Sequence, residues 1–109
     1  MTKLVVFKDG EHFIGFECVG HSGYAQHGED IVCAAVSALT MHTLNALTDV
    51  VGIQVGFEVA EAYLECILPS DLSDEDAKSA KVLMDALYLS LDNLQKQYET
   101  YITITELEV

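Results

Sequence analysis

The sequence predicts an α+β fold: a single layered domain over residues 1–109, with elements in the order β-β-α-β-β-α-β and a mixed or antiparallel sheet packed against two helices. Two observations carry this prediction. Segments rich in β-branched and aromatic residues alternate with two long segments rich in alanine and leucine. The strand-like segments also come in pairs separated by short turns, which is typical of hairpins rather than of the long crossovers that parallel strands need.

The first pair of strands is predicted over residues 2–8 and 12–19, TKLVVFK and HFIGFECV. Asp9-Gly10 between them is a dipeptide suited to a tight hairpin turn. The two strands are therefore expected to pair in antiparallel fashion.

A first helix is predicted from Asp30 to about Val50, because the segment is rich in alanine and leucine and apolar over most of its circumference. Such a helix is expected to be largely buried. Gly52 is the expected stop signal.

A second hairpin is predicted over residues 53–59 and 61–68, with its turn near Ala60-Glu61 and its end at Pro69. In residues 53–59 the apolar side chains alternate, which places them on one face of a strand. These side chains are Ile53, Val55, Phe57 and Val59.

A second helix is predicted over about residues 74–97. Ser73 is the expected N-cap, followed by acidic residues in the first turn, where the helix dipole favours negative charge. Its apolar stripe consists of Ala80, Leu83, Leu87, Leu91 and Leu94, with Met84 and Tyr88 beside them. The alternation in residues 100–109 predicts a final strand.

The charge balance limits the classes of partner. The chain has 18 acidic and 5 basic residues, no arginine, and a formal net charge of −13. Such a surface repels phosphate backbones, so direct binding of nucleic acid is not expected. It attracts basic partners, although a surplus of acid that serves only solubility remains an alternative.

The predicted compartment and the predicted redox state of the cysteines rest on sequence patterns that the chain lacks. The continuous apolar runs are far shorter than the roughly 20 residues that span a bilayer, and the N-terminal segment lacks the apolar stretch of a signal peptide. No membrane contact is expected, and the predicted location is cytoplasmic. The 3 cysteines are odd in number and irregularly spaced, which indicates reduced thiols rather than disulfides.

The stretch GHSGYAQHGEDIVCAAVSAL, residues 20–39, carries the chemistry. Cys33 is expected in the first turn of the first helix, where unpaired N–H groups and the dipole stabilise a thiolate. His21 lies just after the second strand and could fold back to form an ion pair with Cys33, as a Cys-His hydrolase requires. A buried cysteine that acts as a small hydrophobe is the alternative interpretation.

The loop before the helix is a candidate substrate loop. Gly20, Gly23 and Gly28 frame it and permit unusual backbone conformations. With Ser22 and Tyr24 it could close over a bound peptide.

Two further residues are candidates for supporting roles. Ser37 follows Cys33 by one helical turn and is expected on the same helix face. Asp30 is either the N-cap of the helix or the group that orients His21, and the sequence leaves both roles open.

The remaining thiols and imidazoles give weaker signals. Cys18 and Cys66 fall within predicted strands and are interpreted as core residues. His27 with His21 and Glu29 would form only a poor metal site, because the spacing matches no zinc pattern. No metal and no cofactor are therefore expected.

The two-part motif Gly20-His21-Ser22-Gly23-Tyr24-Ala25 and Gly28 to Leu39 resembles the signature of the ribosomal-processing cysteine protease family, Prp, over the whole chain. The resemblance implies that His21 is the catalytic histidine and Cys33 the nucleophile. Asp30 and Ser37 also occupy motif positions, and Ser22 departs from the alanine common in the family.

The resemblance also implies a substrate. Family members remove a short N-terminal extension from the large-subunit ribosomal protein that reaches toward the peptidyl-transferase centre, cut after a pair of aromatic residues, and are expected to be homodimers. The alternative function is a non-catalytic acidic module that binds a basic ribosomal protein as an assembly chaperone. It explains the charge of −13 equally well but gives no reason to pair His21 with Cys33.

Overall fold

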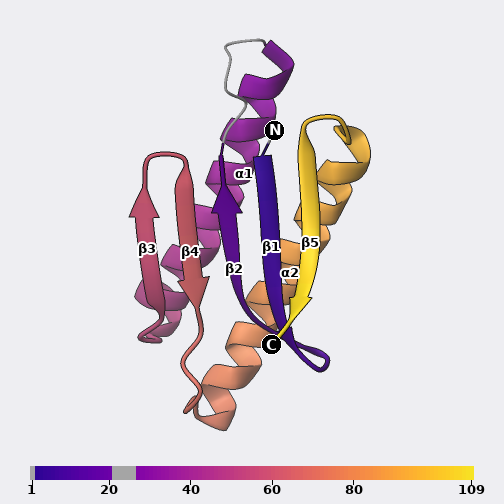
Figure 1. Cartoon of the computed structure of the whole chain (residues 1–109). Helices are drawn as coiled ribbons and strands as arrows, with labels where there is room; N and C mark the ends of the chain where they lie inside the picture. The colour runs from indigo at the N-terminus through magenta and orange to yellow at the C-terminus, as the bar shows by residue number, and fades with distance from the viewer. Residues whose placement is uncertain (1, 21–26) are drawn as a thin grey trace.

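The fold is a five-stranded sheet with two long helices on one of its faces (Figure 1). The computed structural model describes residues 2–20 and 27–109, with side chains for 2–20 and 31–109. The elements are β1 (Thr2–Asp9), β2 (His12–Val19), α1 (His27–Asn45), the π-helical segment η1 (Ala46–Val51), β3 (Gly56–Ala60), β4 (Tyr63–Ile67), α2 (Asp74–Gln97) and β5 (Ile102–Glu108).

The strand order β3-β4-β2-β1-β5 confirms the predicted α+β class and makes the sheet mixed. The hairpins β1–β2 and β3–β4 are antiparallel, as is the β2–β4 pair, whereas β5 lies parallel to β1. The first and last strands of the chain are therefore neighbours, and β3 and β5 are the two edges.

The core lies between the helices and the face of the sheet that they cover. Even-numbered residues of β1 such as Leu4 point into it, and Phe16 of β2 is fully buried there. The helices contribute the apolar stripes that their periodicity predicts. These are Val32, Val36 and Leu44 from α1, and Ala80, Met84, Leu87 and Leu91 from α2.

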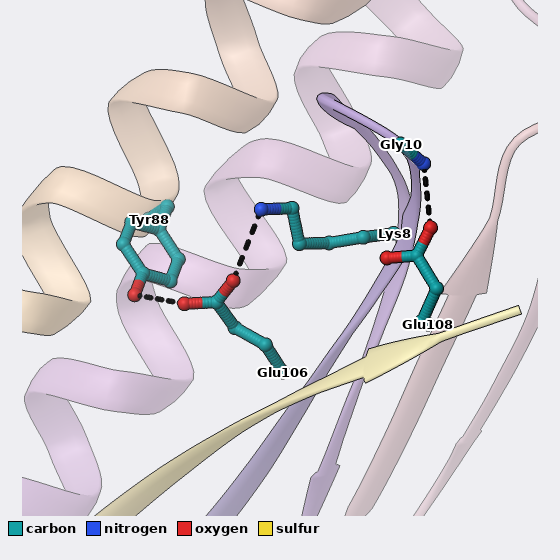
Figure 2. A network of polar contacts seen from close by, with 5 residues as sticks. All are labelled: Lys8, Gly10, Tyr88, Glu106 and Glu108. Atoms are coloured by element: carbon teal, nitrogen blue, oxygen red, sulfur yellow. Dashed lines mark hydrogen bonds and ion pairs between the residues drawn. The ribbon is translucent and has the colours of Figure 1, made fainter.

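The second helix begins and ends where the sequence predicts. Ser73 is its N-cap, and the Ser73 Oγ accepts a hydrogen bond of 3.1 Å from the Asp76 amide. Glu106 of β5 accepts from the Tyr88 hydroxyl of α2 at 2.8 Å and pairs with Lys8 of β1 at 3.1 Å (Figure 2). This network joins the helix to two neighbouring strands.

The first helix begins earlier than predicted. It starts at His27, so Gly28 lies inside the helix rather than in the preceding loop, and Asp30 is in the first turn rather than at the N-cap. Acidic residues in the first turn are favoured by the helix dipole, which offsets the low helix propensity of glycine. The continuous helical stretch formed by α1 and η1 ends as predicted at Gly52, whose φ of +88° suits a left-handed C-cap.

The third strand is shorter than predicted, because residues 53–55 lie outside it. Ile53 and Val55 are buried in the segment that precedes the strand, whereas Phe57 and Val59 are 60% and 50% exposed. The alternation was therefore not the mark of one buried face. An edge strand receives cover from only one neighbouring strand, and α1 does not cover these two side chains.

One described helical stretch, Ile31–Val51, has the length and composition to cross a membrane. Interspersed polar residues, Ser and Thr among them, divide this stretch into short apolar runs, so no continuous run in the sequence predicts it. Core helices pass the same test, and Val32, Val36, Leu44 and Leu47 of this stretch are part of the core.

Candidate active site

A cavity of about 220 Å³ lies between α1 and the β3–β4 hairpin. Cys33 and Ser37 of α1 line one side of it, and Val59 and Leu64 of the hairpin line the other. Pockets that enclose a whole small-molecule ligand are larger, roughly 300–1,000 Å³. The cavity therefore fits a part of a larger substrate whose remainder lies outside.

Cys33 is the seventh residue of α1, so the prediction that it lies in the first turn is wrong. Only the first four amides of an α-helix lack intrahelical acceptors, and the dipole acts mainly within the first turn. The Cys33 amide is thus part of the helix. Because helical side chains tilt toward the N-terminus, its half-buried sulfur leans toward the turn formed by residues 27–30.

Ser37 lies one turn after Cys33 along the same cavity wall and is exposed. Behind it, Thr40 also lines the cavity but is 1% exposed. The Thr40 hydroxyl donates to the Val36 carbonyl at 2.8 Å, so its polar group is satisfied within the helix. Ser37 is therefore the hydroxyl of α1 that is open to a substrate in this cavity.

Cys18 of β2 lines the same cavity, which the sequence analysis missed when it classed this residue with the core. Burial raises the pKa of Cys18 to about 11, and repulsion from Cys33 adds to the shift. Cys66 is fully buried, as predicted, and burial raises its pKa also to about 11. The position of Cys18 two residues before the Gly20-His21 motif was the available signal.

The mouth of the cavity is held by the end of β2 and the turn of the β3–β4 hairpin. The Gly20 amide donates to the Ala62 carbonyl at 2.8 Å, and both residues have a positive φ, +80° and +59°. Gly20 adopts this conformation without the steric cost that a side chain brings. Nearby, the Tyr63 hydroxyl donates to Glu17 Oε2 at 2.9 Å, and this bond is the main cause that raises the pKa of Tyr63 to about 12.

The structure brings Gly20, Cys33 and Ser37 together at this cavity. The other predicted site residues lie where the side chains are not described. His21, Ser22, Gly23 and Tyr24 lie outside the described residues, and Gly28 and Asp30 are described only as part of the α1 backbone. Among the residues with described side chains, no group of three or more His, Cys, Asp or Glu is placed to hold a metal ion.

Comparison with known proteins yields one family. Residues 1–103 match the family described as cysteine protease Prp. The ribosomal processing cysteine protease Prp of Bacillus subtilis (strain 168) is 29% identical over 94 residues, which cover 84% of each chain.

Solved structures match over nearly the whole chain. SMU.848 from Streptococcus mutans gives a TM-score of 0.86 at 26% identity and covers 100% of this chain and 96% of its own. The ribosomal processing protease Prp from S. aureus, in complex with a substrate peptide, gives a TM-score of 0.84 at 17% identity and covers 98% and 100%. At that identity the likeness of the S. aureus protein establishes the fold alone.

Proposed function

The chain belongs to the cysteine protease Prp family and is a cysteine-type peptidase, and from this premise we propose that it trims the N-terminal extension of a large-subunit ribosomal protein during ribosome maturation. The observation that carries the proposal is the cavity shared by Cys33 and Ser37, at the motif position of the nucleophile. The B. subtilis relative is named as a ribosomal processing protease. An S. aureus relative was solved with a covalently linked product peptide.

The proposed chemistry uses Cys33 and His21 as a dyad. The Cys33 thiolate attacks the scissile carbonyl carbon, and the tetrahedral intermediate collapses as the C–N bond breaks and the His21 imidazolium gives its proton to the leaving amine. The product is a thioester on Cys33. Water then attacks the thioester carbonyl and passes one proton to His21, and the C–S bond breaks. The thiolate of Cys33 is restored, and the released carboxylic acid gives its remaining proton to the solvent.

Backbone amides at the beginning of α1 are the proposed donors to the oxyanion. Residues 27–30 carry the amides without intrahelical acceptors, and the Cys33 side chain leans toward them. Because Cys33 lies beyond the first turn, the helix dipole alone stabilises its thiolate weakly. The charge of His21 therefore has to supply the larger part of that stabilisation.

The remaining residues of the motif have proposed supporting roles. Gly20, Ser22, Gly23, Tyr24 and Gly28 belong to the segment that closes over the peptide. Asp30 orients His21, since the start of α1 at His27 leaves it no role as an N-cap. Ser37 contributes a hydroxyl to the cavity wall.

The whole chain is proposed to work as one protease domain in the cytoplasm, as a homodimer without metal or cofactor. The net charge of −13 suits a basic ribosomal substrate. Three exposed apolar residues of α1 are available to a second copy: Ile31, Ala34 and Ala38. Light scattering coupled to gel filtration tests the dimer, and a monomeric mass at micromolar concentration contradicts it.

The decisive experiment is incubation with the organism's own ribosomal protein in its extended form, followed by intact-mass measurement. We expect loss of a short N-terminal peptide with the wild-type chain and no product with Cys33→Ala, whose circular dichroism should be unchanged because the side chain is small. Cys66→Ala is the matched control and should retain trimming, although with lower stability. Trimming by Cys33→Ala would contradict the dyad, and no trimming by the wild type would contradict the substrate.

A further inference from the structure

The free edge of β3 is the feature that the proposed function leaves unexplained. Its neighbour in the sheet is β4, and two backbone hydrogen bonds between β2 and the ends of β4 fix the direction in which the N–H and C=O groups of each β4 residue point. The Gly20 amide donates to Ala62, and the Leu68 amide donates to Ile14, each at 2.8 Å. Gly20 is thus hydrogen-bonded to its opposite residue Ala62, and Ile14 to its opposite residue Leu68. Along two antiparallel strands, hydrogen-bonded pairs of opposite residues alternate with pairs that are not hydrogen-bonded, so the next pair inward from each of these is not hydrogen-bonded.

These next pairs inward are Val19 with Tyr63 and Gly15 with Ile67. Tyr63 and Ile67 of β4 therefore direct their N–H and C=O groups away from β2, toward β3. The N–H and C=O groups of their β3 partners, Ala60 and Gly56, point back toward β4.

Because the backbone alternates along a strand, Phe57 and Val59 direct their N–H and C=O groups to the free edge. No backbone hydrogen bond described for residues 2–20 and 27–109 uses these four groups. Figure 1 shows β3 at the outer edge of the sheet. The edge presents two donors and two acceptors in the spacing of a further strand.

The opposite edge of the sheet is closed in part. On β5, the amide of Ile104 donates to the Gln95 side chain of α2 at 2.7 Å. Unpaired edges favour association with other chains, and natural sheets commonly cover or block them. The β3 edge has no such cover among the described residues.

The β3 edge is continuous with the active-site cavity, because Val59 and Ala60 belong to both. The cavity is too small to enclose a polypeptide, so the segment next to the scissile bond must lie outside it. An extended segment that leaves the cavity along β3 meets the unpaired groups of Val59 and then those of Phe57. Strand addition of this kind is a common mode of peptide recognition.

The charge on the open face of the sheet, which the helices do not cover, also favours an extended substrate segment at this edge. Glu58, Glu65 and Glu17 lie directly opposite one another on β3, β4 and β2. Like charges in such positions are destabilising. The ion pairs described for the chain join Lys8, Lys81 and Lys96 to other carboxylates. A basic side chain placed beside Glu58 would relieve the repulsion.

We propose that the free edge of β3 binds an extended segment of the substrate as an added strand, through the backbone groups of Phe57 and Val59. The inference rests on the proposed peptidase function and deepens it. Side chains of the segment alternate, so those on the helix side lie beside the exposed Phe57 and Val59, and a lysine or arginine on the open side lies beside Glu58. The substrate class is thus a segment in which apolar and basic residues alternate.

The first test changes the substrate rather than the protein. A synthetic peptide that spans the cleavage site and the alternating segment is N-methylated at one amide at a time, and kcat/KM is measured with the wild-type chain. We expect kcat/KM to fall about tenfold when the methyl group is on every second amide of the paired segment, because only every second amide points toward β3. Methylation of the amides in between should change kcat/KM little. An equal effect at all positions, or none, would overturn the proposal.

The second test removes a donor from the edge. Phe57→Pro deletes the outward amide, which an edge strand tolerates, and Gly56 accepts the backbone restriction that a following proline imposes. Phe57→Ala is the matched reference, because it loses the same ring but keeps the amide. We expect kcat/KM of Phe57→Pro to be about tenfold below that of Phe57→Ala at similar melting temperatures. Equal values at similar melting temperatures would contradict the proposal.

Amide hydrogen exchange by NMR on Cys33→Ala provides a readout that does not depend on catalysis. The Phe57 and Val59 amides should exchange rapidly in the free protein and become protected when the unmodified peptide is added, while the Gly56 amide changes little. Protection without peptide that grows with protein concentration would show that the edge pairs with a second copy, and would overturn the proposal. If the wild type fails to cleave the peptide at all, the proposed function fails, independently of the edge.

Discussion

The three cysteines are the residues at which the structure separates chemistry from packing. Cys33 and Cys18 line the same cavity, from α1 and β2, whereas Cys66 is completely buried in the core. Burial raises the pKa of both Cys18 and Cys66 to about 11. Since the thiolate is the reactive form, these two thiols are protected from reaction by their surroundings.

We therefore predict that iodoacetamide alkylates Cys33 first at neutral pH. A pKa near 11 leaves less than about one thiolate in a hundred at pH 8, so Cys18 and Cys66 should react at least about tenfold more slowly than Cys33. Mass spectrometry of peptides taken at timed intervals measures the three rates. His21→Ala should slow Cys33 alone. If Cys33 reacts no faster than Cys18 between about pH 5 and 8, the chain is better explained as the acidic binding module.

Two glycines in neighbouring strands should respond in opposite ways to the same substitution. A Cβ at Gly15 of β2 would lie 2.6 Å from the backbone oxygen of Cys66, whereas at Gly56 of β3 the nearest atom would be 3.8 Å away. We expect Gly15→Ala to lower the free energy of unfolding by about 1–3 kcal/mol through overpacking. Gly56→Ala should be neutral or stabilising by less than about 1 kcal/mol.

Urea denaturation of both glycine variants at neutral pH makes the comparison. Two of the three atoms nearest a Cβ at Gly15, the Cys66 oxygen at 2.6 Å and the Ile67 Cα at 3.2 Å, belong to the backbone of β4, and only the third, Ile67 Cδ1 at 2.7 Å, is the end of a side chain. Rotation of Ile67 alone therefore cannot make room for a methyl group. Equal stability of the two variants would show that β2 and β4 can move apart at Gly15.

At the scale of elements, Glu106 provides polar contacts that join α2 to the parallel pair β1–β5, beside the hydrogen bond from the Ile104 amide to Gln95. The hydrogen bond from Tyr88 is the largest cause that lowers the pKa of Glu106, and Lys8 lowers it further. The same bond raises the pKa of Tyr88 to about 12. The ring of Tyr88 also stacks on Phe13 at 4.9 Å between centroids.

The sign of the pH dependence follows from the lowered pKa. A carboxyl group whose pKa is lower in the folded state stabilises the fold above its unfolded pKa, and the contribution is lost as the pH falls through the folded value. Glu106→Gln should thus be less stable than the wild type at pH 7, by less than about 1 kcal/mol because the group is solvent-exposed. The difference should shrink below roughly pH 4.3.

Urea midpoints of Glu106→Gln and the wild type at neutral and acidic pH test this prediction. Asp85→Asn is the matched control, because its pair with Lys81 lies within α2 and joins no other element. A difference between wild type and Glu106→Gln that stays constant or grows in acid would contradict the role assigned to the network.

At the scale of the whole molecule, the net charge of −13 has a kinetic consequence. Charges further apart than the Debye length, about 8 Å at physiological salt, are largely screened, so attraction of a basic substrate acts mainly at low salt. We predict that kcat/KM for the full ribosomal protein falls by about tenfold or more as salt is added. A short, near-neutral peptide across the cleavage site should show little change.

Initial rates at several salt concentrations for both substrates decide this question. The proposed chemistry at Cys33 is the same for the two substrates, so a difference in their salt dependence isolates the encounter step. If kcat/KM of the two substrates depends on salt in the same way, the acidic surface does not attract the substrate and serves only solubility.

Much of the fold was predictable because its signals are local. The Ser73 cap and the apolar stripe of α2 each depend on residues within a few positions of one another, and both were confirmed. The first hairpin was also confirmed, but its turn is Gly10-Glu11 rather than Asp9-Gly10, because β1 continues to Asp9, which pairs with His12. The family could also be predicted, because the two parts of the motif around Cys33 are long and lie close together in the sequence. Sequence alone thus determined the α+β class, the order of the elements and the peptidase family.

Only the tertiary structure decided which elements meet. No local signal states that β5 pairs in parallel with β1 or that β3 is an edge, since these pairings join segments far apart in the chain. The start of α1 at His27 moved Cys33 into the second turn and excluded Asp30 as the cap. Cys18 and the β3–β4 hairpin joined the site of Cys33 because the sheet order places them beneath α1. Periodicity describes one segment's own faces, whereas burial, edges and cavities depend on what lies opposite.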